Sequence, residues 1–374
     1  MSSLDTAERL VGLVRVEVLG LISELSTLSA GSNTSGLPEV LLFHERLRDF
    51  VTRFGSMRRT KVAAHVMDGL RAGGSAQLEA LASACAGLEL FHAAALVHDD
   101  LIDSSDTRRN SPTFHIGWST GSGPVMALKD KGNQLELGAV AGLLGGNALL
   151  ILSARAIDQI PAAQRAPIAR LFQEIQLRTI FGELQDSVLE ANCAAADVAA
   201  IAEMAINKTA WYTVIVPMMF SAYCAGQGDE LLGPIVDAGS SYGQGFQLLD
   251  DVTEVLGDPA VTGKSPLDDL RSGKATRLHH LVDSRCTAEE KVQLDQVYGC
   301  RDAGAAELEI YRTLVDRHWP AVNEELQDLF GAARARLYSA GFSERTVYDV
   351  ENELNPQIQG IAPMLTKADR GYGG

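Results

Sequence analysis

Apolar residues recur every three or four positions along most of the chain, which is the spacing of one buried face of an α-helix. Between Leu78 and Leu101 this stripe runs through Leu81, Cys85, Leu88, Phe91, Ala95 and Leu96. Similar patterns occupy residues 167–189, 198–224, 231–255 and 311–337. Alternation of period two among β-branched residues is scarce, so the pattern predicts an all-α fold of about ten or more helices and no strand.

Short polar segments divide this helical pattern. Residues 1–36 read as an N-terminal amphipathic helix and a polar linker, residues 37–367 as one large helical domain, and residues 368–374 as a disordered tail. Residues 116–134 are predicted to form a long irregular connection, which would be a lid, a surface insertion or a partner-binding loop.

Two uncharged stretches, residues 137–154 and 209–228, approach the roughly 18–20 apolar residues of a membrane span. The first contains several glycines, and the second contains Pro217 and several hydroxyl residues. A helix that is apolar all round also occurs in the centre of a large helical domain. We therefore expect buried helices here and no membrane span.

Composition narrows the class of protein further. The 374 residues are 46% hydrophobic, and 32 basic against 48 acidic side chains give a formal charge of −16. This excludes a disordered chain, and with no run of Lys or Arg it argues against binding to nucleic acid. The five cysteines form no C-x-x-C pair, and the N-terminus has no basic region followed by an apolar stretch. Both features predict reduced cysteines and a cytoplasmic location.

Two acidic clusters follow strongly apolar helical stretches. In the first, Asp99 and Asp103 are four residues apart and share one face of a helix, with Asp100 beside them. The second cluster, Asp250, Asp251 and Glu254, repeats this arrangement. Like charges at this spacing destabilise a helix, and carboxylate oxygens suit Mg²⁺, whose coordination substrate phosphates can complete. The alternative is a pair of solvated acidic faces.

Basic residues accompany both clusters. Arg108 and Arg109 follow the first, and Lys264 and Lys274 follow the second. Placed beside metal-binding carboxylates, these side chains could neutralise the remaining charge of a phosphorylated substrate. Lys208 opens the second uncharged stretch, where it either extends from a helix end to solvent or binds phosphate.

Together these motifs resemble the trans-isoprenyl diphosphate synthases, also called polyprenyl synthetases, from about Gly55 to Thr276. The matching segments are Leu88–His92, Asp99–Asp103, Arg108-Arg109, Gly182–Asp186, Lys208-Thr209, Phe246-Gln247 with Asp250-Asp251, and Gly263-Lys264 with Gly273–Thr276. The resemblance implies a single antiparallel helical bundle around a central cavity, a homodimer, and two acidic clusters facing each other at the cavity mouth.

The resemblance also implies a role for each residue. It assigns Asp99, Asp103 and Asp250 as Mg²⁺ ligands supported by Asp100, Asp251 and Glu254; Arg108, Lys208, Lys264 and Lys274 to the allylic diphosphate; Arg58, His92 and Arg109 to isopentenyl diphosphate; and Thr209 and Gln247 to the developing cation. The implied activity is a prenyltransferase of isoprenoid biosynthesis, which condenses an allylic prenyl diphosphate head-to-tail with isopentenyl diphosphate.

Several family positions are altered: the family's Gly-Asp after the first cluster reads Gly146-Asn147, and its usual Gly-Gln reads Gly182-Glu183. The usual Gly-Lys-Arg-x-Arg reads Gly55-Ser-Met-Arg-Arg-Thr60, so Met57 replaces the expected lysine and Thr60 the second arginine. The residues for the allylic substrate are intact, whereas those for isopentenyl diphosphate are damaged. Two alternatives therefore stay open: a class I terpene synthase that ionises and cyclises an allylic diphosphate, and a non-catalytic partner subunit of a prenyl synthase.

Product length depends on the depth of the cavity below the first cluster. Ala94 and Ala95, five and four residues before Asp99, leave the path of a growing chain open. Phe91 lies eight residues before Asp99, about 12 Å deeper along a helix, and is either the floor of the cavity or a core residue. We predict a product of geranylgeranyl or farnesyl length, with geranylgeranyl favoured.

Overall fold

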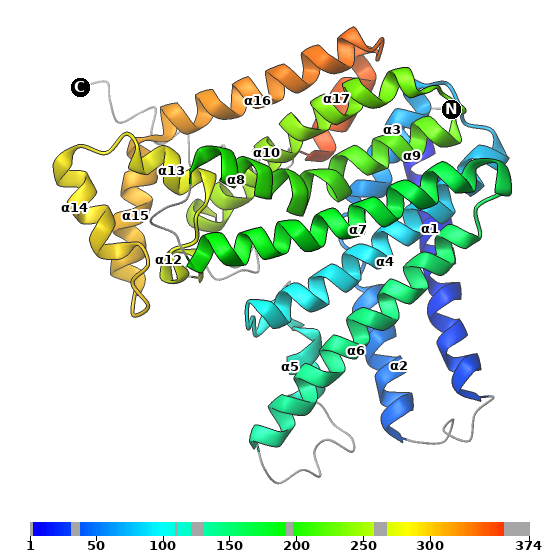
Figure 1. Cartoon of the computed structure of the whole chain (residues 1–374), viewed down its shortest axis with the longest axis horizontal. Coiled ribbons are helices and arrows are strands. Elements are labelled where there is room, and N and C mark those ends of the chain that lie inside the picture. The colour runs from blue at the N-terminus through cyan, green and yellow to red at the C-terminus, as the bar shows by residue number, and fades with distance from the viewer. Residues whose placement is uncertain are drawn as a thin grey trace. The chain divides into compact units, whose positions relative to one another are not determined.

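The computed structural model describes residues 3–30, 38–108, 111–120, 131–191, 197–257 and 268–354. The chain forms two compact units, which are described separately. Unit 1 comprises residues 1–173 and 217–228, and unit 2 comprises residues 174–216 and 229–374. Both are built almost entirely of helices, so the predicted all-α class is confirmed (Figure 1).

Unit 1 is organised around one buried helix, α4. Its elements are α1 (Ser3–Ala30), α2 (Pro38–Thr52), α3 (Arg58–Gly69), α4 (Ser75–Ile102), β1 (Thr107–Arg108), β2 (Ser111–Pro112), α5 (Phe114–Thr120), α6 (Lys131–Asp158), the first half of α7 (Ala162–Ala191), and α9 (Val216–Cys224). Helices α1, α3 and α6 pack on α4, whose small and apolar residues are buried on nearly every side. The stripe predicted between Leu78 and Leu101 is therefore part of this core.

Glycines allow α6 to approach α4 closely. A Cβ added at Gly146 would lie 2.1 Å from His98 Nε2, and one added at Gly142 would lie 2.9 Å from Leu101 Cδ1. Real Cβ atoms do not come this close to a neighbour, so a larger residue would force the helices apart. Gly142 and Gly146 of the uncharged stretch 137–154 thus pack against the helix that carries the first acidic cluster.

The prediction of an irregular connection over 116–134 was wrong at both of its ends. Helix α5 covers residues 114–120, and α6 begins at Lys131. Phe114 and Trp118, one helical turn apart, are buried and pack edge-on against Phe43, with ring centroids 6.2 and 6.0 Å away. This aromatic contact stabilises a helix in a segment whose glycines and serines favour an irregular structure. Residues 121–130 lie outside the described part of the chain.

The prediction that the chain has no strand was also wrong, by one short hairpin. Strands β1 and β2 pair antiparallel, with Thr107 opposite Pro112 and Arg108 opposite Ser111. Strands of two residues are too short to produce a detectable period in the sequence. The hairpin nevertheless matters, because it turns Arg108 back toward the end of α4.

Unit 2 is organised around α10. Its further elements are α8 (Val198–Ala205), the π-helix η3 (Ile206–Ile215), the 3₁₀ turn η4 (Asp229–Leu231), α10 (Leu232–Leu256), α12 (Asp268–Ser272), α13 (Arg277–Asp283), α14 (Ala288–Val297), α15 (Ala305–Arg317), α16 (Trp319–Ser339) and α17 (Glu344–Leu354). Helix α10 packs on α16 and η3, and α14 packs beside α15 (Figure 1). Tyr242 of α10 is fully buried, and its ring centroid lies 5.6 Å from that of Phe330 in α16.

Two described helices are long and apolar enough to cross a membrane by length and composition alone, Ser75–Ile102 and Gln134–Asp158. The apolar window of the first is 78% buried, as expected of a core helix, and that of the second is 44% buried. The absence of a membrane span and the cytoplasmic location stay predictions. The linker after Ala30 and the tail 368–374 lie outside the described residues.

Candidate active site

The first acidic cluster occupies the last turn of α4. The backbone N–H of Asp103 donates to the Asp99 carbonyl at 2.8 Å, so the helical turn continues through Asp103. Asp99 and Asp103 are thus one turn apart, as their spacing predicts. The Asp99 side chain is 23% exposed, whereas that of Asp100 is fully buried.

Arg108 clamps this cluster. Its Nε donates to Asp100 Oδ1 and its Nη2 to Asp99 Oδ2, both at 2.7 Å. Burial raises the pKa of Asp100 to about 6, although Arg108 opposes the shift. Arg108, which the family resemblance assigns to the allylic diphosphate, therefore positions Asp99 and Asp100 in this structure. Arg109 lies outside the described residues.

The second cluster lies near the end of α10 and belongs to a hydrogen-bonded chain. Thr209 Oγ1 donates to Gln247 Oε1 at 2.9 Å, and Gln247 Nε2 donates to Asp251 Oδ1 at 3.0 Å. Asp251 is buried, whereas Asp250 and Glu254 are half-buried. The structure thus brings together three of the residues singled out from the sequence and orients the Gln247 amide between them.

A π-helix carries Lys208 and Thr209. Such helices are rare and occur frequently at functional sites. Lys208 Nζ lies 2.7 Å from Asp186 Oδ2 and 2.9 Å from Glu183 Oε2. The sequence left open whether Lys208 extends to solvent, and this pairing gives it a fixed partner inside unit 2.

Asp186 joins two of the predicted cations. Lys274 Nζ lies 3.0 Å from the same Oδ2 atom that Lys208 contacts. Burial by itself would raise the pKa of Asp186, but Lys274 and Lys208 together lower it, so the carboxylate stays charged. Lys274 is also held through its carbonyl, which accepts a hydrogen bond from Tyr298 Oη. Lys264 lies outside the described residues.

Sequence reasoning did not assign Asp186 and Glu183 to the site. The signal was present in the segment Gly182–Asp186, which was noted only as a matching motif. Gly182 has its own role there, because an added Cβ would lie 2.3 Å from the backbone nitrogen of Lys208. This glycine allows α7 to approach the π-helix so closely that Lys208 reaches two carboxylates.

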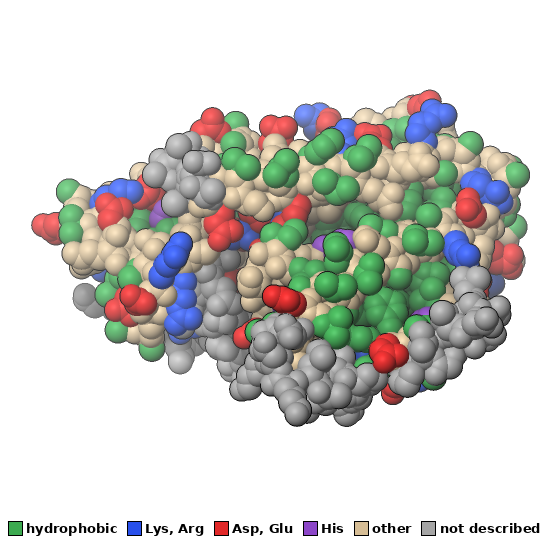
Figure 2. Space-filling model, turned by 60° about the horizontal axis from the view of Figure 1, so that its bottom comes forward, with side chains coloured by type: hydrophobic (Ala, Val, Ile, Leu, Met, Phe, Trp, Pro, Cys, Tyr) green, Lys and Arg blue, Asp and Glu red, His purple; other side chains and the backbone are tan. Residues whose placement is uncertain are grey.

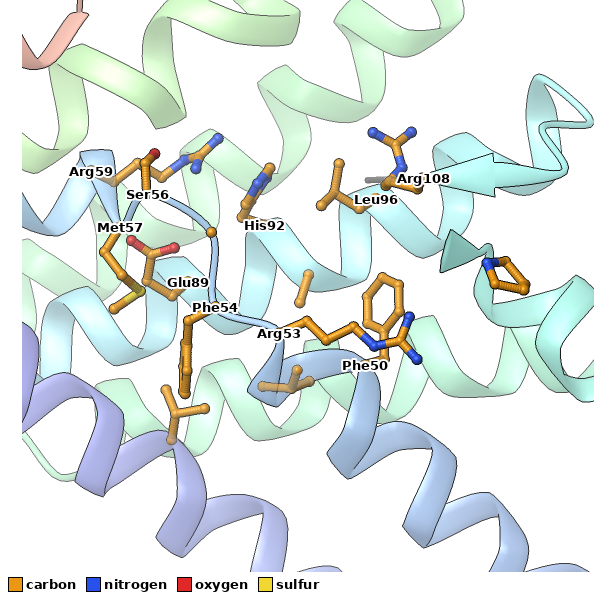
Figure 3. A pocket seen from close by; sticks show the side chains of 15 residues that line it. Phe50, Arg53, Phe54, Ser56, Met57, Arg59, Glu89, His92, Leu96 and Arg108 are labelled. Atoms are coloured by element: carbon orange, nitrogen blue, oxygen red, sulfur yellow. The ribbon is translucent and has the colours of Figure 1, made fainter. Parts of the chain in front are cut away.

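A pocket in unit 1 contains the altered signature. Its ionisable lining residues are Arg53, Arg59, Glu89, His92 and Arg108, and Met57 also lines it. Figure 3 shows Met57 and Glu89 at one end, Arg108 at the other and His92 between them. Arg59 lines this pocket and Arg58 is not among its described lining residues. Met57 is 4% exposed and holds a left-handed backbone conformation with φ of 52°.

Thr60 lies beside this pocket and donates to Glu89 Oε1 at 2.9 Å. Where the family signature has an arginine, this chain therefore has a hydroxyl bonded to a carboxylate. Arg53, Arg59 and Arg108 supply positive charge to the pocket, whereas Met57 supplies none. The pocket can receive an anion with fewer cationic contacts than the full signature would provide.

The residues proposed to limit chain length are all on α4. Phe91 and Ala94 are buried, and Ala95 is half-buried. The Phe91 ring packs edge-on against Phe172 of α7, with centroids 6.0 Å apart. The contact agrees with a core role and leaves the proposed floor of the cavity a prediction.

Both acidic clusters fit a hard divalent cation. Every candidate ligand is a carboxylate oxygen, which is the donor type that Mg²⁺ prefers. Asp100 Oδ2 is buried and has no hydrogen-bond partner among the described residues. A buried carboxylate oxygen without a partner is costly, and a cation would satisfy it. The predicted facing of the two clusters concerns the placement of one unit relative to the other and stays a prediction.

Comparison with known proteins gives a consistent result. The sequence model of a family described as "Polyprenyl synthetase" matches residues 42–314. The geranylgeranyl diphosphate synthase of Saccharolobus solfataricus is 28% identical over 247 residues, which cover 63% of this chain and 66% of that protein. A (2E,6E)-farnesyl diphosphate synthase of Mycobacterium tuberculosis is 31% identical over 191 residues, covering 50% of this chain and 47% of that protein. The chain thus spans about half to two thirds of the length of these curated relatives.

Solved structures share the fold over nearly the whole chain. A crystal structure of geranylgeranyl pyrophosphate synthase from Corynebacterium glutamicum, complexed with isoprenyl diphosphate and magnesium, superposes with a TM-score of 0.79 at 24% identity. The superposition covers 92% of this chain and 98% of that one. A geranylgeranyl pyrophosphate synthetase from Pyrococcus horikoshii gives a TM-score of 0.72 at 17% identity, covering 95% and 98% of the two chains.

Proposed function

The chain belongs to the polyprenyl synthetase family, and from this membership we propose that it is a magnesium-dependent prenyltransferase. The proposed reaction joins an allylic prenyl diphosphate head-to-tail to isopentenyl diphosphate and yields a short-chain trans-prenyl diphosphate. The relatives named above make products of farnesyl and geranylgeranyl length, and we propose a product in this range.

One observation carries the proposal: cations that a diphosphate would need contact the first acidic cluster and lie in the unit that carries the second. Arg108 contacts two carboxylates of the first cluster, and Lys208 and Lys274 converge on Asp186 in the unit that carries the second. A pair of solvated acidic faces would not require half-buried cations held by fixed ion pairs. Cationic side chains beside carboxylate oxygens are instead what a site needs to bind a diphosphate together with its metal ions.

The residues support the chemistry as follows. When bound, Mg²⁺ supplies Lewis-acid stabilisation of the departing diphosphate, and the carboxylates of Asp99, Asp103 and Asp250 would hold it. Lys208 and Lys274 add positive charge toward the leaving group. The Gln247 amide, fixed by Thr209, presents a neutral dipole suited to a developing carbocation.

The acceptor substrate is proposed to bind in the pocket of Arg53, Arg59 and His92. There the apolar Met57 and the carboxylate of Glu89 favour a second candidate function, in which isopentenyl diphosphate binds poorly and an allylic diphosphate is ionised and cyclised. The charge composition of this pocket is the observation behind that alternative.

Incubation with Mg²⁺ and geranyl or farnesyl diphosphate, with and without isopentenyl diphosphate, separates the candidates. Longer prenyl diphosphates that require isopentenyl diphosphate support the proposal. Hydrocarbons or alcohols formed without it support the terpene synthase, and no turnover supports a non-catalytic partner subunit.

The metal-binding role has a matched test. Asp99→Asn and Asp250→Asn should each lower the turnover number by at least ~100-fold, the order of loss when one preorganised electrostatic group is removed. Asp158→Asn, an exposed aspartate at the end of α6, serves as the control and should be unaffected. Unchanged turnover in the first two variants, or turnover that survives chelation of Mg²⁺, contradicts the proposal.

We also propose that the protein is a homodimer. Figure 2 shows hydrophobic side chains in several places on the face that it draws. Large apolar side chains that are at least 37% exposed lie on α6, at Leu135, Leu137, Val140, Leu143, Leu144 and Ile151, and on α7, at Leu177, Ile180, Phe181, Leu184 and Val188. Exposed apolar surface of this kind marks interaction sites. Light scattering should give twice the chain mass for the wild type and a lower mass for Ile180→Glu, and a monomeric wild type refutes the proposal.

A further inference from the structure

Three side chains with different ligand atoms meet in the C-terminal part of unit 2. Cys286 follows α13, Glu290 lies in the first turn of α14, and His318 lies at the junction of α15 and α16. One ligand atom from each lies within 4.8 Å of the others. None of the three belongs to the acidic clusters, their cations or the pocket described above.

The separations suit a small tetrahedral ion. Zinc bonds of about 2.0–2.3 Å to nitrogen, oxygen and sulfur place neighbouring ligand atoms roughly 3.3–3.8 Å apart. His318 Nε2 lies 3.6 Å from Glu290 Oε2, which is already in this range. All three ligand atoms lie within 4.8 Å of one another, so small side-chain rotations would bring them to the spacing of zinc ligands.

One of the three ligand atoms, His318 Nε2, is buried and also has no hydrogen bond within the described part of the chain. Such an atom needs a ligand, because a buried polar atom without a partner destabilises the fold.

Glu290 has other contacts that a metal must accommodate. Its Oε2 accepts the Thr287 N–H at 2.8 Å as part of the cap of α14, and its Oε1 contacts Arg317. Each carboxylate oxygen has two lone pairs, so Oε2 can bind a metal and keep the cap. The Arg317 side chain is 50% exposed and can turn to solvent when a metal replaces it.

We propose that Cys286, Glu290 and His318 form a zinc site, completed by a water molecule, that ties the turn between α13 and α14 to the junction of α15 and α16. A thiolate and an imidazole select Zn²⁺ or Co²⁺ over Mg²⁺, whereas the carboxylate clusters do the reverse. The site would stabilise the fold around α13 to α16, since a metal that binds only the folded chain adds its binding energy to folding.

Cobalt substitution tests the proposal on the full-length chain. After treatment with chelator, titration with Co²⁺ should produce a thiolate-to-cobalt charge-transfer band in the near ultraviolet that saturates at one equivalent and that Zn²⁺ abolishes. Co²⁺ at the acidic clusters gives no such band, because no cysteine belongs to them. Cys286→Ser should remove the band. His318→Gln should weaken Co²⁺ affinity by at least ~10–100-fold, the loss caused by changing even an outer-shell partner.

Cys300 provides the matched control. It is a free cysteine that is partly exposed like Cys286, and Cys300→Ser should leave the band unchanged. A second readout needs no variant: Zn²⁺ should protect Cys286 of the wild type from alkylation, measured by peptide mass spectrometry, without protecting Cys300. Absence of the band, a band that persists in Cys286→Ser, or equal alkylation of Cys286 with and without Zn²⁺ overturns the proposal, whatever prenyl substrates the protein uses.

Discussion

The contact between Gly182 and the backbone of Lys208 makes Gly182→Ala an informative perturbation. The added Cβ would lie 2.3 Å from the Lys208 nitrogen and 2.6 Å from its Cα. Ordinary contact begins at 3.4 Å, so α7 and the π-helix must separate by about 1 Å. A shift of this size would break the 2.7 Å contact of Lys208 Nζ with Asp186.

The expected loss is one of activity more than of stability. Misplacement of a catalytic group by about 1 Å costs on the order of 100-fold in rate. Overpacking typically costs about 1–3 kcal/mol, but alanine is better than glycine in a helix by about 1 kcal/mol, so the net destabilisation is about 0–2 kcal/mol. Gly182→Ala should therefore remain folded while kcat/KM for the allylic diphosphate falls ~100-fold.

Steady-state kinetics with an allylic diphosphate, together with urea unfolding, measure both quantities. Gly20→Ala in the interior of α1 is the control, because within the described part of the chain nothing lies within 4 Å of its added Cβ. This control should retain full activity and gain about 0.5–1 kcal/mol of stability. Lys208→Ala should lose at least as much activity as Gly182→Ala, and the double variant little more, since both act on one contact. A Gly182→Ala protein with kcat/KM close to that of the wild type would refute the reasoning.

Three further predictions concern other parts of the chain. Met57→Lys should lower the KM for isopentenyl diphosphate ~10-fold or more, because one charge-assisted hydrogen bond contributes about 1.5–3 kcal/mol. The control, Met57→Leu, should leave this KM unchanged. Equal KM values in both variants would show that the pocket does not lack a cation. Phe91→Ala should lengthen the products seen by mass spectrometry, and an unchanged product distribution would make Phe91 a core residue only. Burial lowers the pKa of His279, which stacks on Tyr298 at 3.6 Å, to about 4. The unfolded chain therefore binds a proton below pH 6.5 that the folded chain does not bind until about pH 4, so stability should fall between these values, by about 2 kcal/mol at pH 5. Unfolding at pH 7.5 and 5 should show a smaller loss for His279→Phe, and an equal loss would assign the pH dependence to other groups.

The sequence predicted the geometry of a site correctly where all of its residues lie on one helix. The spacing of Asp99 and Asp103 fixes their shared face, because a helix turns through about 100° per residue. The same holds for Asp250 and Glu254 on α10. The sequence could not reveal the π-helix at Lys208, since its ten residues make too few turns to show a period distinct from that of an α-helix. It also misjudged residues 116–120, where the burial of Phe114 and Trp118 stabilises a helix against the local preference of glycine and serine.

The sequence by itself determined the helical class, the two acidic clusters and the membership of the family, because each depends on residue types at short spacings. Only the tertiary structure decided the partner of each charge: Arg108 on Asp99 and Asp100, and Lys208 with Lys274 on Asp186. These pairs join positions 8 to 88 residues apart in the chain, and their formation depends on the close packing that glycines such as Gly146 and Gly182 allow. The physical reason is that the electrostatic energy of a charge pair depends on the distance between the charges and on their burial, and the neighbouring residues in the sequence determine neither.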